Sequence, residues 1–330
     1  MQIHKIIELI DTQKAQLAVL LCHLNADPDA VCAAFAFSQL LKRLKPMLNI
    51  EIAAAQGPSR LSKSLLSRLP AELVMQPRIE EAGVIVLLDT NTVQQLGEWG
   101  DRVKKSKAAL IVIDHHASHP QTESLATLSV ADEKVSSACE MVYRLYKEAQ
   151  VDLAPLEAQA LFLGIAFDTR HFVLANSTTF QVIADLIEAG VKADETLSML
   201  SLPMAPSERI ARLKASKRVK LIKINEWLIA FSNGSAYQAS AARALISVGA
   251  HVAVVAGEKG DRIQISLRAT RDFHEKTSVH LGKDIAKPLG EYLRGMGGGH
   301  ALSAGVNGVG EVEASLKHCS RLLKEKLTRL

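Results

Sequence analysis

The sequence Ala-Leu-Ile-Val-Ile-Asp-His-His at residues 109–116 decides the fold that we predict. It opens with a short, uninterrupted apolar run, which is typical of a strand buried on both faces of a parallel sheet. The run stops at Asp114, His115 and His116, and polar residues follow. Ligands of open α/β sheets bind just beyond the carboxyl ends of the strands. These side chains therefore lie where a site is expected, and they offer oxygen and nitrogen ligands for a divalent metal.

Other apolar segments end in the same way. Acidic or imidazole side chains follow each of them: His23, Asp27 and Asp29 after the strand 17–22, Asp89 after the strand 84–88, and Asp168 after the helical segment 161–166. An isolated Asp-His-His is more simply a capped strand end. Asp27 and Asp29 could likewise only cap the helix that Pro28 starts, but this leaves His23 unexplained. The repetition favours a two-metal site.

Composition sets the class of protein. The 330 residues, of which 48% are hydrophobic, suffice for two domains with sizeable cores. Aromatic residues at 4% argue against a stacking platform for long single strands, and a net charge of +4 permits a phosphate-bearing substrate without requiring one. The 4 cysteines form no C-x-x-C pair, which argues against a zinc ribbon and suits a reducing compartment. With neither a signal peptide nor a membrane-spanning run expected, we predict a cytoplasmic protein without a membrane partner.

The pattern predicts an α/β protein with three parts. Residues 1–190 form a catalytic domain in which helices flank a mainly parallel sheet, with strands at 17–22, 49–55, 84–88 and 109–113. Residues 191–218 form a helical linker, which Pro203 and Pro206 interrupt. Its basic helix could contact nucleic acid but is more simply a solvated face. Residues 219–330 form a smaller α/β domain with a hairpin at 220–231, strands at 250–256 and 262–267, and a helix at 284–294.

A glycine run stands near the end of the second domain. Gly297, Gly298 and Gly299 precede His300, and Arg268 follows a separate strand. Successive glycines let a backbone approach a ligand closely and present N–H groups to an anion. A bare glycine run would favour a flexible turn, whereas His300 and Arg268 favour phosphate recognition. Both interpretations stay open on the residues alone.

The chain resembles the DHH phosphoesterase superfamily over nearly its whole length. The matching pieces stand in the family's order: His23-Leu24-Asn25-Ala26-Asp27-Pro28-Asp29-Ala30, Asp89, Asp114-His115-His116 and Gly164-Ile165-Ala166-Phe167-Asp168-Thr169. The second domain is similar to the associated DHHA1 domain through Ser266-Leu267-Arg268 and the run Gly297–His300. The chain departs from the family at Arg170-His171, where glycine is frequent, and at Pro28. These departures bear on the substrate, because every ligand position is filled.

The resemblance implies two Mn²⁺-like ions, with Mg²⁺ or Co²⁺ as alternatives. By the resemblance, the first ion is held by His23, Asp27 and Asp89, and the second by Asp29, Asp89, His115 and Asp168. Asp114 would orient a neighbouring histidine, and His116 would face the scissile phosphate. A terminal phosphate would be clasped from the second domain by Arg268, Gly297, Gly298, Gly299 and His300.

The resulting hypothesis is a metal-dependent phosphohydrolase of short oligonucleotides (nanoRNA) that also acts on 3′-phosphoadenosine 5′-phosphate. A phosphodiesterase of cyclic or linear dinucleotides and a RecJ-like single-strand exonuclease are alternatives within the fold. An inorganic pyrophosphatase fits less well, because its second domain lacks the Gly-Gly-Gly-His loop. A zinc amidohydrolase leaves Arg268 and the glycine run without a purpose. An inert scaffold predicts eroded ligands, and the resemblance is also compatible with a homodimer.

Overall fold

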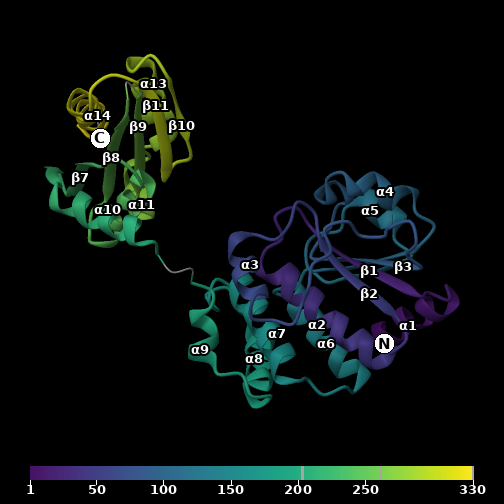
Figure 1. The fold of residues 1–330 in the computed structure, drawn as a ribbon. Coiled ribbons are helices and arrows are strands. Elements are labelled where there is room, and N and C mark those ends of the chain that lie inside the picture. Colours follow the sequence, from purple (N-terminus) through teal and green to yellow (C-terminus); the bar gives the residue numbers. More distant parts are fainter. Residues whose placement is uncertain (202–203, 261, 329–330) are drawn as a thin grey trace. The chain divides into compact units, whose positions relative to one another are not determined.

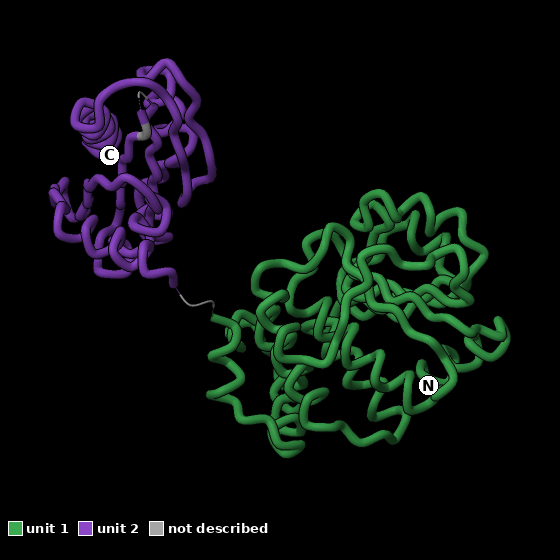
Figure 2. The backbone as a smooth tube through the Cα atoms, in the orientation of Figure 1, with its two compact units in different colours: residues 1–202 green, residues 203–330 purple. Residues whose placement is uncertain are grey.

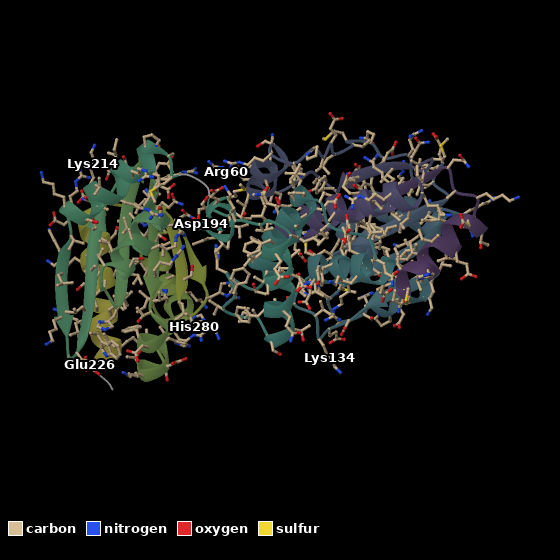
Figure 3. All side chains as sticks on the ribbon, turned by 90° about the horizontal axis from the view of Figure 1, so that it is seen from below. Arg60, Lys134, Asp194, Lys214, Glu226 and His280 are labelled. Carbon is tan, nitrogen blue, oxygen red and sulfur yellow. The ribbon has the colours of Figure 1, made fainter. Side chains whose placement is uncertain are left out.

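A computed structural model of the chain describes residues 1–201, 204–260 and 262–328 (Figure 1). The chain divides into two compact units, Met1–Leu202 and Pro203–Leu330 (Figure 2). The division falls within residues 191–218, which we expected to form a linker: α9 (Ala193–Ser198) belongs to the first unit and α10 (Pro206–Lys217) to the second. Charged side chains such as those of Lys134 and Lys214 project from the surface (Figure 3). Among the described residues, no helix has the length and apolar character needed to cross a bilayer.

The first unit is built on a sheet of 5 parallel strands in the order β2-β1-β3-β4-β5. The strands are β1 (Leu17–Cys22), β2 (Asn49–Ala54), β3 (Val84–Leu88), β4 (Ala109–Asp114) and β5 (Leu128–Ala131). Every residue of β1, β3 and β4 is buried, which explains why these segments are apolar without alternation. The α/β fold class is therefore confirmed. Because all the strands are parallel, their carboxyl ends meet at one edge of the sheet.

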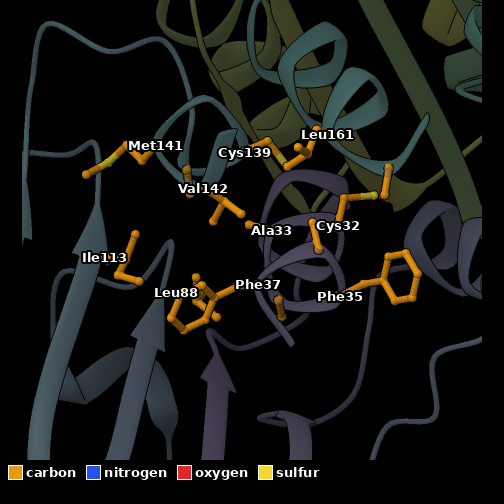
Figure 4. Close-up of a cluster of buried hydrophobic side chains, with 14 of the residues drawn as sticks. Cys32, Ala33, Phe35, Phe37, Leu88, Ile113, Cys139, Met141, Val142 and Leu161 are labelled. Carbon is orange, nitrogen blue, oxygen red and sulfur yellow. The ribbon is translucent and has the colours of Figure 1, made fainter. Parts of the chain in front are cut away.

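Helices cover both faces of this sheet. On one face, Ile111 and Leu20 pack against the buried sides of α1 (Gln2–Thr12), α2 (Pro28–Leu44), α6 (Ala138–Ala149) and α7 (Pro155–Asp168). Figure 4 shows part of this core, with Phe37 of α2 near Leu88 of β3. On the other face, Leu87 packs against the 3-10 helix η1 (Val93–Leu96) and α4 (Trp99–Lys105). The remaining helices of this unit are α3 (Arg60–Leu66), α5 (Pro120–Leu125) and α8 (Ser177–Glu188).

The second unit holds a sheet of 6 strands in the order β10-β11-β9-β8-β7-β6. The pair β7–β8 is parallel, and the other pairs are antiparallel. The strands are β6 (Lys220–Ile224), β7 (Trp227–Asn233), β8 (Val252–Lys259), β9 (Arg262–Ala269), β10 (Met296–Gly299) and β11 (Ser303–Val309). On one face lies α11 (Gln238–Ser247). The other face is covered by α12 (Arg271–Thr277), the π-helix η2 (Leu281–Ala286), α13 (Lys287–Tyr292) and α14 (Val312–Leu327).

The glycine run is not the flexible turn that a bare glycine run would favour. Met296–Gly299 forms β10 and pairs antiparallel with β11, and phosphate recognition stays a prediction. Of these glycines, Gly299 has a positive φ, at 137°. A Cβ on Gly297 would overlap the carbonyl oxygen of Ala286 in η2. The glycine at 297 is therefore needed because β10 passes close to the backbone of η2.

Candidate metal centre

The site residues that the sequence predicts in the first unit meet at the carboxyl edge of its sheet. The loops after β1, β3 and β4 and the last residue of α7 supply them. Within each of three overlapping groups, the candidate ligand atoms lie within 4.8 Å of one another: His23, Asp27 and Asp89; Asp29, His115 and Asp168; and Asp89, Asp114, His115 and His116. The parallel sheet thus brings together residues that are far apart in the sequence.

His23 presents one ring nitrogen to this cluster. Its Nδ1 lies 2.8 Å from the carbonyl oxygen of Leu24, to which it donates a hydrogen bond. The same ring's Nε2 lies 3.9 Å from Asp27 Oδ1 and 3.7 Å from Asp89 Oδ2. A backbone carbonyl that holds one imidazole N–H fixes the tautomer in which the other nitrogen has a free lone pair. In its neutral form, His23 is therefore arranged as a metal ligand.

Asp89 stands between the two candidate metal positions. Its Oδ1 lies 3.4 Å from His115 Nε2, and its Oδ2 faces His23. The residue has a left-handed backbone, with φ 52°, and donates its N–H to the carbonyl of Ile113 at 3.0 Å. Such a backbone costs free energy for a residue other than glycine, and such strain clusters at functional sites. Burial raises the pKa of Asp89, but the two imidazoles outweigh this and lower it.

Asp29 is held by the first turn of a helix that lies 109 residues away in the sequence. Its Oδ2 accepts a hydrogen bond from the backbone N–H of Ala138 at 2.6 Å, and its Oδ1 accepts one from Cys139 at 3.0 Å. Each carboxylate oxygen retains a second lone pair for a cation. Burial is the main cause that raises the pKa of Asp29, and the negative charge of Asp89 raises it further. Sequence reasoning missed these contacts, because backbone amides leave no signal in the residue pattern.

Asp168 reaches the cluster as the last residue of α7. Its Oδ2 lies 3.1 Å from His115 Nε2. The helix ends in a turn in which Arg170, His171 and Phe172 all have positive φ, at 51°, 56° and 69°. This is the segment where the chain departs from the family's frequent glycine, and the left-handed backbone is the conformation that glycine adopts most easily. The turn is kept by Thr169, whose Oγ1 accepts the N–H of Phe172 at 3.1 Å.

His116 is oriented by the carboxylate that precedes it by two positions. Asp114 Oδ1 accepts the backbone N–H of His116 at 2.9 Å and lies 2.8 Å from its Nδ1. Asp114 is buried, whereas the side chain of His116 is 52% exposed. The Asp114 carboxylate raises the pKa of His116. His116 therefore offers a fixed, accessible ring with its Nε2 free of this contact.

The buried atoms of the cluster fit a metal. Asp89 Oδ1, Asp114 Oδ2 and His115 Nε2 have no hydrogen-bond partner within the described part of the chain. Buried polar atoms without partners are costly, so a group from outside the chain is expected to satisfy them. Burial lowers the pKa of His23 and His115, but neighbouring carboxylates outweigh it and raise the values to about 10 and about 11. In the metal-free chain, protonated imidazoles thus supply the positive charge that cations would bring.

A small cavity behind Asp114 was not anticipated. The polar residues that follow the Asp-His-His motif were not expected to form a helix, whereas α5 begins at Pro120 and brings His119 and Thr122 beside this carboxylate. Within the described residues, His119 Nδ1 and Thr122 Oγ1 are also buried without a hydrogen-bond partner. No sequence signal pointed to them, because both lie in a polar segment without periodicity.

The candidate substrate residues of the second unit lie on three adjacent strands. Arg268 in β9 stands opposite Ser303 in β11, and Gly299 in β10 stands opposite Ala304. The exposed residue His300 follows β10, and its N–H donates to the carbonyl of Ser303 at 2.8 Å. The guanidinium of Arg268 donates to the carbonyl of Leu267 at 2.8 Å. The antiparallel pairing thus gathers these residues at one end of the sheet.

The chain is similar to known proteins over most of its length. Residues 18–165 match the model of the DHH family, N-terminal domain. The protein MJ0988 of Methanocaldococcus jannaschii is 32% identical over 302 residues, which cover 91% of this chain and 89% of that protein. A probable bifunctional oligoribonuclease and PAP phosphatase NrnA of Streptococcus mutans is 24% identical over 92% of this chain and 93% of its own. An exopolyphosphatase-related protein of Bacteroides fragilis shares the fold, with a TM-score of 0.63, 19% identity and coverage of 98% and 95%.

The parallel sheet, the clustered acids and imidazoles, and these matches together define a phosphoesterase. The chain belongs to the DHH family of phosphoesterases. The family resemblance stated from the sequence is thereby confirmed.

Proposed function

We propose that the protein is a divalent-metal-dependent phosphohydrolase of short oligonucleotides that also acts on 3′-phosphoadenosine 5′-phosphate, with Mn²⁺ as its cation. The convergence of acids and imidazoles on three overlapping ligand groups carries this proposal. The match to the NrnA of Streptococcus mutans over more than nine-tenths of both chains supports the substrate class. The four free cysteines suit the reducing cytoplasm, which we propose as its compartment.

The ligand sets that we propose are those that the family resemblance implies, and the proximity of their ligand atoms supports them. His23, Asp27 and Asp89 would hold one cation, and Asp29, Asp89, His115 and Asp168 would hold the other. Asp89 would be shared, because its two oxygens face different imidazoles. When bound, such a pair of cations lowers the pKa of water and stabilises the charge that develops on phosphate.

The chain's own groups would orient the substrate. Asp114 fixes the ring of His116, so that Nε2 can donate a hydrogen bond to a phosphoryl oxygen. The half-exposed position of His116 allows this contact without displacing a buried ligand. Its raised pKa favours the protonated ring, which is the form that donates from both nitrogens.

A digestion panel tests the proposal. Purified protein is incubated with Mn²⁺, Mg²⁺ or Co²⁺ and an RNA dinucleotide, longer RNA and DNA oligomers, 3′-phosphoadenosine 5′-phosphate, a cyclic dinucleotide or pyrophosphate. We expect the fastest hydrolysis with Mn²⁺ and short RNA, and its loss in Asp89→Asn. Asp101→Asn is the matched control, because Asp101 is exposed and pairs with Lys104 away from the site. No hydrolysis of any phosphate ester by metal-loaded protein would overturn the proposal.

A further inference from the structure

Within the described residues, the carboxylate of Asp114 is held at one of its two oxygens. Its Oδ1 accepts the backbone N–H of His116 at 2.9 Å and lies 2.8 Å from Nδ1 of the same residue. Its Oδ2 is buried and bonds no described residue. The terminal torsion of an aspartate is broad, so staggered rotamers do not fix the plane of the carboxylate. The group that binds Oδ2 therefore decides how firmly Asp114 holds the ring of His116.

Two more polar atoms without partners belong to residues that line the same small cavity. His119 Nδ1 and Thr122 Oγ1 are buried, and neither bonds a described residue. Both residues line the cavity together with Asp114 and His116. Its volume of about 10 Å³ matches the roughly 10–15 Å³ that a single buried water requires. Such waters make about three hydrogen bonds each, to polar groups that otherwise lack partners. The cavity therefore meets the conditions for one water.

The segment between the Asp-His-His motif and β5 is anchored at both ends. Before α5, the side-chain amide of Asn91 donates to the carbonyl of Ala117 at 3.0 Å. After α5, the N–H of Thr127 donates to the carbonyl of Leu110 at 2.7 Å, and Thr127 Oγ1 accepts the N–H of Leu110 at 3.1 Å. Thr122 lies between these anchors and is 2% exposed. The anchors place the segment without using the hydroxyl of Thr122, which leaves that hydroxyl available to the cavity.

We propose that one buried water bridges Asp114 Oδ2 to His119 Nδ1 and Thr122 Oγ1. Through this bridge, His119 and Thr122 are positioning residues for His116. The water donates a hydrogen bond to Asp114 Oδ2, because a carboxylate oxygen accepts and does not donate. The bridge fixes the plane of the carboxylate, and the carboxylate fixes the ring that faces the phosphoryl group. This inference rests on the proposed function and extends it to two residues that touch neither the cations nor the substrate.

Removal of the Thr122 hydroxyl tests the bridge in the RNA dinucleotide assay with Mn²⁺. Thr122→Val deletes the hydroxyl at nearly constant shape, and Thr122→Ser keeps it. We expect kcat to fall about tenfold or more in Thr122→Val, because groups that orient an active residue are worth about 10–100-fold. The KM and the Mn²⁺ affinity should stay within about twofold, because the variant alters neither substrate binding nor a metal ligand. Thr122→Ser should restore most of kcat.

A matched control and a double-mutant cycle separate positioning from a general loss of structure. Thr127→Val removes a hydroxyl of the same segment that bonds Leu110, so it should lower stability and leave kcat unchanged. In a His116→Ala background, Thr122→Val should not lower kcat further, whereas independent effects would multiply. His119→Phe keeps an aromatic ring without its nitrogens, and its effect should vanish in the same background. An equal loss in Thr127→Val, or a full additional loss in the His116→Ala background, would overturn the proposal.

A crystal structure of the protein gives a readout that does not depend on activity. We expect an ordered water within hydrogen-bond distance of Asp114 Oδ2, His119 Nδ1 and Thr122 Oγ1, and its loss in Thr122→Val. A wild-type structure in which these atoms bond other groups would overturn the bridge. If the wild type hydrolyses no phosphate ester, the proposed function fails, while the crystal structure still decides the bridge. Circular dichroism confirms that the variants are folded, and His119→Phe replaces Thr122→Val in the test if the latter does not fold.

Discussion

Gly164 is the residue of α7 that packs against Cys139 and the candidate ligand Asp29, and its replacement by alanine tests the packing there. A Cβ at this position would overlap the Sγ of Cys139 and would lie 2.7 Å from Asp29 Oδ1 and 3.0 Å from Cys139 Cβ. Both neighbours are buried, and Asp29 is held by the N-terminus of α6. The added methyl group cannot be accommodated without moving a candidate ligand.

The expected change in the free energy of unfolding is the difference between two opposing effects. Overpacking a core by a methyl group costs about 1–3 kcal/mol. Alanine favours the helix over glycine by roughly 1 kcal/mol, so the free energy of unfolding should fall by only about 0–2 kcal/mol. A displaced group beside a metal weakens its binding by about 10–100-fold. We therefore expect Gly164→Ala to weaken Mn²⁺ binding by about 10–100-fold and to lower the free energy of unfolding by no more than about 2 kcal/mol.

Two measurements separate these effects: urea unfolding of the metal-free protein and calorimetric titration with Mn²⁺. Gly234→Ala is the matched control, because a Cβ there meets its nearest heavy atom, the Ala236 carbonyl oxygen, at 3.8 Å. The double variant Cys139→Ala/Gly164→Ala removes the sulfur overlap and should recover part of the affinity. Wild-type affinity in Gly164→Ala, or an equal loss in Gly234→Ala, would refute the reasoning.

Other predictions concern protons, acid stability and the accessible histidine. The pKa of His23 is raised to about 10 and that of His115 to about 11 in the metal-free chain, so both rings carry a proton at pH 8. Metal uptake at this pH should therefore release about two protons, which is measured from the buffer dependence of the binding heat. No proton release would contradict the ligand assignment. Burial raises the pKa of Asp284, but Lys326 and the His280 N–H outweigh it and lower it. A carboxylate whose pKa is lowered in the folded state stabilises the fold above its unfolded pKa, and this contribution is lost as the pH falls through the folded pKa. Lys326→Met should therefore cost about 0.5 kcal/mol at pH 7 and progressively less as the solution is acidified, measured by urea unfolding. His116→Ala should lower kcat about 10²–10⁴-fold and leave Mn²⁺ affinity unchanged in the calorimeter, and a parallel loss of affinity would place His116 among the ligands.

The predictable part of the fold is the part that the local pattern encodes. The strands β1, β3 and β4 are continuous apolar runs, and a parallel sheet requires that pattern. Because the carboxyl ends of parallel strands meet, residues such as Asp89 and His115 could be expected in one cluster from their positions alone. The strand β5 was missed, because it has only 4 residues and one is buried.

The features that the sequence does not reveal are those that depend on backbone contacts between distant parts of the chain. The amides of Ala138 and Cys139 hold Asp29 across 109 and 110 positions, and any residue types could provide them. The glycines of β10 suggest a loop by composition, yet Gly297 is fixed by the approach of η2. A glycine in the sequence can indicate that a side chain does not fit at that position, but the neighbouring element that excludes the side chain is known only from the fold.

We propose that the carboxyl edge of the first unit's sheet holds two divalent cations that share Asp89. Titration of metal-free protein with Mn²⁺ in a calorimeter, with the bound metal counted by mass spectrometry, tests it most directly. We expect two ions for each wild-type chain and weaker binding at both sites in Asp89→Asn, because the oxygens of Asp89 face His23 and His115. One ion or none in the wild type, or an Asp89→Asn variant that still binds two ions with unchanged affinity, would contradict it.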